Sequence, residues 1–183
     1  MNDAHLHLVV NHFPIIFPIA AVIIMAIGLI AKSEPVKRTS FLIFIIGSLA
    51  TIFAMSTGEG AEEVVEHISG VSENYIETHE EAAELFAILS YILGGLSLFG
   101  LWASFKLKSL SKIISLATLA FALVVLFFAK QTGTTGGEIR HTEIRDNAIS
   151  SESSNPNNTA SDNHTENKAD SGDNGEHDSE HED

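Results

Sequence analysis

Histidine is the residue type in this sequence that is best placed to carry chemistry. Nine histidines occur in 183 residues, and imidazole both binds metal ions and exchanges protons near neutral pH. No cysteine is present, which excludes thiolate metal ligands, iron–sulfur clusters and covalently attached c-type haem. Many glutamates accompany the histidines. Six histidines lie outside the C-terminal tail, and these are His5, His7, His12, His67, His79 and His141.

Four apolar stretches must position these histidines. They cover residues 13–31, 41–57, 82–105 and 113–129, and each approaches the roughly 20 apolar residues that a helix needs to cross a bilayer. The stretches are continuously apolar, whereas the strands of a membrane barrel alternate. The sequence therefore predicts an all-α integral membrane protein, a four-helix bundle in contact with the lipid bilayer.

Basic residues predict the orientation of this bundle, because Lys and Arg in short loops favour the cytoplasm. Residues 1–12 and 58–81 contain neither. The loops after the first and third stretches together carry six: Lys32, Lys37, Arg38, Lys106, Lys108 and Lys112. We therefore expect both termini, and all nine histidines, on the non-cytoplasmic side of a cytoplasmic membrane. Lys130, Arg140 and Arg145 are a weaker opposing signal.

The long loop at residues 58–81 is expected to be amphipathic and helical. Its pattern predicts a short acidic helix, a break at Ser69-Gly70 and a second helix. Ser72 is a favourable N-cap residue for that second helix. Nothing after Ser72 interrupts the helix except Gly94 and Gly95, so we expect it to continue into the third span.

The chain divides into two regions, a transmembrane domain at residues 1–145 and an acidic tail at residues 146–183. The tail holds 11 of the 24 acidic residues, a single Lys and no aromatic residue. Such a composition buries too little apolar surface to offset the entropy lost on folding. A disordered tail is predicted.

His12 and His79 are the candidate ligands of a b-type haem. His12 is the last polar residue before the first helix becomes apolar, and His79 shares a helix face with Ala83 and Phe86. The first and third helices lie diagonally in an up-down-up-down bundle, so the two imidazoles can face each other and bind iron axially. Arg140 and His141 are further candidate cofactor-binding residues. They follow a glycine-rich segment that can fold them over the bundle mouth, where Arg140 can pair with an acid or a haem propionate; a simple tether to the tail is the alternative.

A mixed metal site and a proton-carrying group are alternatives to haem. Glu63 and His67 are four residues apart on one helix face, an arrangement that suits Zn or Mn, and Glu80 completes this candidate site. Glu84 enters the apolar region, where a carboxylate needs a partner or a proton, and it is the candidate titrating group of a proton or metal-ion carrier. The alternative without a bound ligand is a structural role, in which the histidines cap helices and form hydrogen bonds with glutamates or lipid headgroups.

Three segments resemble the uncharacterised bacterial membrane proteins grouped as domain of unknown function 2231. They are HLHLVVNHFPI at residues 5–15, TGEGAEEVVEHISGVSENYIETHEEA at residues 57–82 and GGEIRHTEI at residues 136–144. The resemblance implies a multi-pass protein of the bacterial inner membrane. Some members are joined to cytochrome-type modules, which favours electron transfer with a membrane or periplasmic redox partner.

The sequence thus favours a membrane protein that binds haem b or a metal ion at its non-cytoplasmic mouth and serves electron transfer. No phosphate-binding loop, nucleophile elbow or HExxH motif indicates a hydrolase or a nucleotide-driven pump. The first alternative is a non-enzymatic membrane subunit or scaffold, in which Ser90, Gly94 and Gly95 form a surface for a partner helix. The second is the carrier that uses Glu84.

Overall fold

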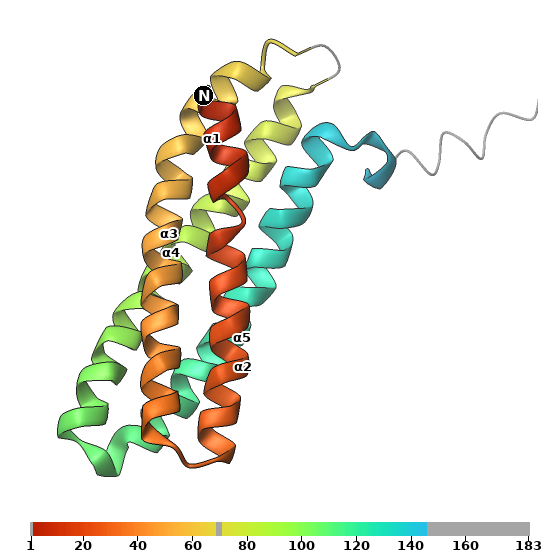
Figure 1. Cartoon of the computed structure of the whole chain (residues 1–183). Helices are drawn as coiled ribbons and strands as arrows, with labels where there is room; N and C mark the ends of the chain where they lie inside the picture. Colours follow the sequence, from red (N-terminus) through yellow and green to blue (C-terminus); the bar gives the residue numbers. More distant parts are fainter. Residues whose placement is uncertain (1, 69–70, 146–183) are drawn as a thin grey trace, which may run out of the picture.

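A computed structural model describes residues 2–68 and 71–145, and within these ranges it contains helices and no strand. Figure 1 shows one elongated bundle in which the chain runs up and down. The elements are α1 Asp3–Val10, α2 Phe13–Ile30, α3 Glu34–Val65, α4 Glu73–Lys106, α5 Lys108–Arg140 and the short 3-10 helix η1 Thr142–Ile144. The predicted break at Ser69-Gly70 and the predicted disordered tail lie outside the described residues.

Four helices in this bundle are long and apolar enough to cross a membrane. They are the continuous pair α1–α2 and the helices α3, α4 and α5. The all-helical four-helix bundle is thereby confirmed. α2 is adjacent to α3 and α5, and α4 is adjacent to the same two helices, so α2 and α4 are diagonal, as predicted.

α1 is a short helix that the sequence did not predict. The Asn2 side chain caps it by accepting a hydrogen bond from the backbone N–H of His5 at 3.0 Å. The helix ends at Val10 because Pro14 has no N–H to donate to the Val10 carbonyl, four residues earlier. The chain turns at Asn11 and His12 and resumes as α2, with Pro14 in the first turn, where the missing N–H costs nothing.

The acidic segment after the second apolar stretch belongs to α3. We expected a separate short helix there, but α3 continues from Glu34 to Val65 without interruption. Its glycines, Gly58 and Gly60, lower helix propensity without breaking the helix. α4 begins directly after Ser72 and passes through Gly94 and Gly95 to Lys106, as the sequence predicts.

The interior of the bundle combines small and hydroxyl-bearing residues with a hydrophobic core that includes Met25, Phe41 and Phe44, and large apolar residues also cover the surface. Ile23, Ile30, Leu98 and Phe127 are all more than half exposed. This distribution is typical of helices that pack through small side chains in lipid. The buried hydroxyl residues come from all helices except α1 and α2: Ser40, Thr51, Ser90, Ser97, Ser104, Ser111, Ser115 and Thr118.

Close contacts between α3 and α4 depend on these small residues. The Thr51 and Ser90 hydroxyls lie 2.8 Å apart. A Cβ atom added to Gly94 would lie 2.6 Å from Cβ of Ser48, so only glycine fits there. Ser90 and Gly94 therefore mark a helix interface as predicted, but the interface lies within this chain. Gly95 faces outward, with nothing within 4 Å of an added Cβ atom.

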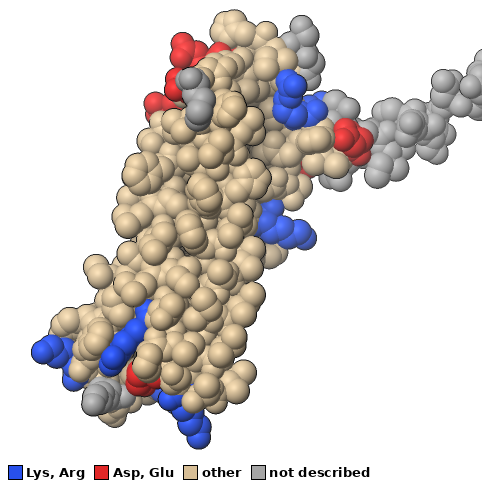
Figure 2. Space-filling model, in the orientation of Figure 1, with Lys and Arg blue, Asp and Glu red and all other residues tan. Residues whose placement is uncertain are grey.

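A charged cluster joins α3 to α5 at the end of the bundle that carries both short connections. Lys37 is buried, and its Nζ donates hydrogen bonds to Glu34 at 2.7 Å and to the Ser111 hydroxyl at 3.1 Å. Ser111 in turn donates to the second carboxylate oxygen of Glu34 at 2.7 Å. Most of the Lys and Arg side chains gather at this basic end, while the acidic side chains gather mainly at the other end (Figure 2).

The helices extend well past the apolar stretches at the acidic end. α3, α4 and α5 contain 32, 34 and 33 residues. At 1.5 Å per residue they are roughly 50 Å long, against about 30 Å for the hydrocarbon core of a bilayer. We call the extension the histidine end and define it as residues 3–12, 58–65, 73–81 and 130–145.

Candidate functional site at the histidine end

His7 attaches α1 to α3. Its side chain is partly buried, and its Nδ1 lies 3.1 Å from the Ala54 carbonyl oxygen and 3.0 Å from the Thr57 hydroxyl. The Thr57 hydroxyl donates its own proton to the backbone carbonyls of Phe53 and Ala54. Both neighbours of Nδ1 are therefore acceptors. Nδ1 of His7 must carry the proton, and Nε2 presents a lone pair.

His79 is held in the same way between α4 and α5. Its Nδ1 lies 3.1 Å from the Thr135 hydroxyl, which donates to the Thr132 carbonyl at 3.1 Å. When the Thr135 hydroxyl proton is directed to the Thr132 carbonyl, Nδ1 of His79 is the donor and Nε2 presents a lone pair. A Cβ atom added to Gly136 would lie 2.9 Å from Cε1 of His79. The glycine is thus what allows the imidazole to rest against the α5 backbone.

Both imidazoles are neutral at pH 7. They lie beyond the apolar stretches, which begin at Phe13 and Ala82. Burial lowers the pKa of His7, against a smaller raising effect of the hydrogen bond to the Ala54 carbonyl. Burial also lowers the pKa of His79, and the charge of protonated His7 lowers it further. The histidine end thus holds two partly buried imidazoles, one on α1 and one on α4.

His12, the predicted partner of His79, does not take this place. It is exposed at the turn between α1 and α2, and its Nδ1 lies 3.3 Å from the Leu8 carbonyl. The physical reason is helical phase. The buried residues of α2 recur in steps of three and four, and they are Pro14, Pro18, Ala21, Met25 and Gly28. The same steps taken backward from Pro14 reach Asn11 and then His7. His12 lies outside this stripe. The stripe is the sequence signal that would have identified His7.

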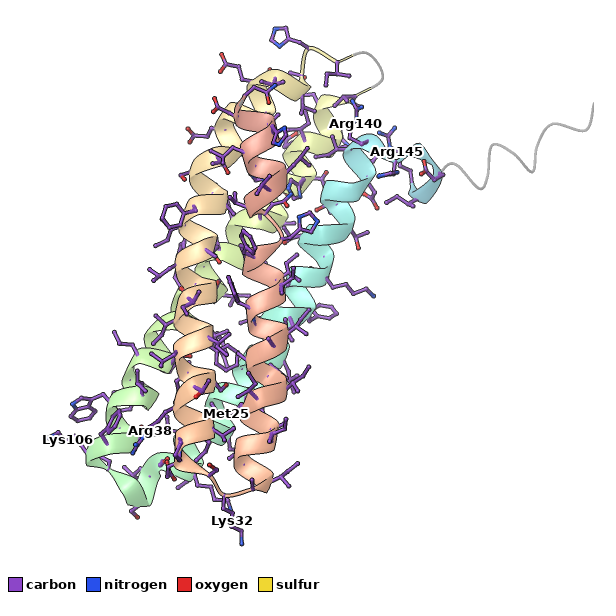
Figure 3. All side chains as sticks on the ribbon, in the orientation of Figure 1. Met25, Lys32, Arg38, Lys106, Arg140 and Arg145 are labelled. Atoms are coloured by element: carbon purple, nitrogen blue, oxygen red, sulfur yellow. The ribbon has the colours of Figure 1, made fainter. Side chains whose placement is uncertain are left out.

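The C-terminal end of the bundle also differs from the prediction. The glycines of residues 133–137 are helical within α5, so they neither fold back nor form a tether. Arg140 and His141 are exposed, and His141 bonds Glu143 at 2.9 Å. The residue that turns back is Arg145. Its guanidinium donates to the Glu138 and Ile139 carbonyls and lies 4.1 Å from the centre of the Tyr75 ring. Figure 3 shows Arg140 and Arg145 together at this end.

The predicted mixed metal site is not assembled. Glu63 and Glu80 are exposed, and Nδ1 of His67 bonds the Glu63 carbonyl at 2.8 Å rather than its carboxylate. Glu80 is instead near Glu62, whose pKa is raised by burial and then by the charge of Glu80. Within residues 2–68 and 71–145, no three His, Asp or Glu side chains come together in a group that could hold a metal ion.

Glu84, the candidate titrating group of a carrier, is exposed on the outer surface of α4. It lies two residues past the start of the third apolar stretch, where a carboxylate can reach the headgroup layer. A carrier needs its titrating group inside the bundle or on a water-filled path. The position of Glu84 therefore lends no support to that alternative.

Comparisons with family models, curated proteins and solved structures found nothing that matches this chain. Function must therefore be inferred from the chemistry of His7, His79 and their neighbours.

Proposed function

We propose that this chain is an integral protein of a bacterial cytoplasmic membrane, with its histidine end on the outer side. The apolar surface of the four long helices supports the membrane location, since water would solvate so many exposed Ile, Leu and Phe side chains poorly. The resemblance to the bacterial family agrees with this location. Lys32, Arg38 and Lys106 lie at the opposite end of the bundle from Arg140 and Arg145, which belong to the histidine end (Figure 3). This supports a cytoplasmic position for the basic end.

The orientation predicts the behaviour of reporter fusions. An alkaline phosphatase domain, which folds only outside the cytoplasm, is expected to be active when fused after Arg145 and inactive when fused after Lys106. A green fluorescent protein at the same two points should give the opposite pattern. Phosphatase activity at Lys106 with none at Arg145 would reverse the proposed topology, and the paired reporters exclude simple loss of expression as a cause.

We further propose that the histidine end binds a metal centre, either a metal ion or the iron of haem b, and passes electrons to a membrane or periplasmic partner. One observation carries the proposal: His7 and His79 are partly buried imidazoles at the same end of the bundle, and both engage Nδ1 in hydrogen bonds. Such a bond fixes the tautomer and orientation of a metal-binding histidine and makes its Nε2 a better ligand. The centre would supply the redox chemistry, while the protein supplies the two nitrogen ligands.

The test is a visible difference spectrum and a metal analysis on the full-length protein purified in detergent. We expect one chromophore or one metal ion per chain, and we expect His7→Ala and His79→Ala each to abolish it. His12→Ala is the matched control, because His12 is exposed and lies near the same end; it should retain full occupancy. Equal loss in all three variants, or no bound centre in any sample, would refute the proposal.

A structural role is the second candidate, and the same hydrogen bonds favour it. His7 ties α1 to α3, and His79 ties α4 to α5, which suits a membrane subunit or scaffold that binds no cofactor. Under this alternative, His7→Gln and His79→Gln would largely preserve thermal stability, because the amide can still donate across the helices. The purified protein would then be colourless and free of stoichiometric metal.

A further inference from the structure

Asn11 has a buried polar atom that the described residues leave without a partner. Its side-chain oxygen, Oδ1, is inaccessible to solvent and accepts no hydrogen bond from residues 2–68 or 71–145. A buried carbonyl-type oxygen with no donor costs roughly 1–3 kcal/mol, so such atoms usually have a ligand, an ion or a water molecule nearby. Asn11 therefore needs an explanation.

Helical geometry places Asn11 one turn from His7 and near the level of His79 along the bundle. Its backbone N–H bonds the His7 carbonyl at 2.9 Å, so Asn11 lies one turn from His7 on the same inward-facing stripe. On the other side of the bundle, Ile15 approaches Gly133, and His79 lies against Gly136, one turn further along α5. One turn back from Ile15 is Asn11. Asn11 is thus at the height of His79 and directly below His7.

The residues at this level of the bundle offer three acceptor atoms without a proton of their own. They are Nε2 of His7, Nε2 of His79 and Oδ1 of Asn11, and each is uncharged. If these lone pairs share one space without a donor, they are complementary to a cation. Two imidazole nitrogens and one amide oxygen suit borderline ions such as Cu²⁺, Zn²⁺ and Ni²⁺, whereas Mg²⁺ and Ca²⁺ require mainly oxygen ligands.

We propose that His7, His79 and Asn11 form a site for a single transition-metal ion, and that this ion, rather than haem, occupies the histidine end. The inference rests on the proposed function and names its ligand. The contact with Gly136 argues against haem, because an added Cβ atom would lie 3.4 Å from Nε2 of His79. The α5 backbone therefore occupies one side of Nε2, where a porphyrin needs open space all around the iron.

The test is a titration of full-length, detergent-purified protein that has first been stripped with a chelator. Cu²⁺ and Zn²⁺ are added in competition with a chromophoric chelator, and Mg²⁺ serves as the ion that should not bind. We expect one site per chain and an affinity order of Cu²⁺ above Zn²⁺. Asn11→Leu should weaken binding by at least about tenfold, a loss typical of removing a supporting group at a metal site.

Asn11→Asp is the companion variant, since it keeps the size of the side chain and adds a negative charge. It should tighten binding of both ions and restore the fold if Asn11→Leu disturbs it. Unchanged affinity in both Asn11 variants, with binding still lost in the His7→Ala and His79→Ala proteins, would overturn the role of Asn11 and leave the proposed function standing. A haem spectrum without metal affinity would do the same. Metal binding that survives both histidine variants would overturn both proposals.

Discussion

Gly94→Ala is expected to lower the free energy of unfolding by about 1–3 kcal/mol, the usual cost of overpacking a well-filled interior. The added Cβ atom would lie 2.6 Å from Cβ of Ser48, an atom fixed by the α3 backbone. α3 and α4 must therefore move apart, which also weakens the hydrogen bond between Thr51 and Ser90. The measurement is an unfolding titration in mixed micelles, where dodecyl sulfate replaces a mild detergent and circular dichroism reports helix content.

The neighbouring glycine provides a control for helix propensity. Gly95→Ala introduces the same methyl group one residue along α4, where nothing lies within 4 Å. It should leave stability unchanged or raise it by up to about 1 kcal/mol, since alanine is the better helix former. If the two variants shift stability equally, the close approach of α3 and α4 at Gly94 is wrong. If only Gly95→Ala is destabilised, the outer face of α4 holds a contact made by another molecule.

Glu34→Gln should destabilise the basic end of the bundle by about 2 kcal/mol. Lys37 is almost fully buried, with 4% of its side chain exposed, and in this variant it loses the one carboxylate that pairs with it among the described residues. The expected cost lies between the values for exposed and for buried ion pairs, because the Glu34 side chain is 36% exposed. The same micelle titration measures it. In the double variant Glu34→Gln/Lys37→Met most of the loss should be recovered, since no buried charge remains.

Acid should weaken the same cluster. Burial alone would raise the pKa of Glu34, but the hydrogen bonds from Lys37 and Ser111 and the charges of Lys37 and Arg38 outweigh it, so the pKa is lowered. A carboxyl group with a lowered pKa stabilises the folded state above its unfolded pKa, and this stability is lost as the pH falls through the folded pKa. The Glu34→Gln protein lacks this pH-dependent contribution to the free energy of unfolding. Identical acid sensitivity in both proteins would show that the cluster contributes nothing.

The helices were predictable because their signals are local. Continuous apolar stretches predicted four long helices, and Ser72 followed by a sequence without strong breakers predicted that α4 starts at Glu73 and runs through two glycines. The small residues Ser90 and Gly94 predicted a close helix contact. Sequence did not show that the acidic segment after Thr57 would stay in α3, because its polarity is typical of a loop although its helix propensity is adequate.

The candidate site was only half predicted. His79 faces the interior as expected, because α4 is regular and its phase can be read from Ile76 and Phe86. The partner predicted for His79 was wrong. His12 lies at the expected level along the helix, but its side chain faces outward and is exposed. The turn between α1 and α2 is set by Pro14, and a single residue of phase separates an inward side chain from an outward one.

The sequence by itself determined that this protein has four apolar helices, a basic end and a histidine-rich end, because composition and periodicity act residue by residue along the chain. Tertiary structure alone decided that Arg145 rather than Arg140 contacts Tyr75 of α4, that His7 bonds α3 while His79 bonds α5, and that Ser48 lies against Gly94. These choices depend on which backbone lies within a few ångströms of each side chain. That distance is set by how α3, α4 and α5 pack together, and no local pattern encodes it.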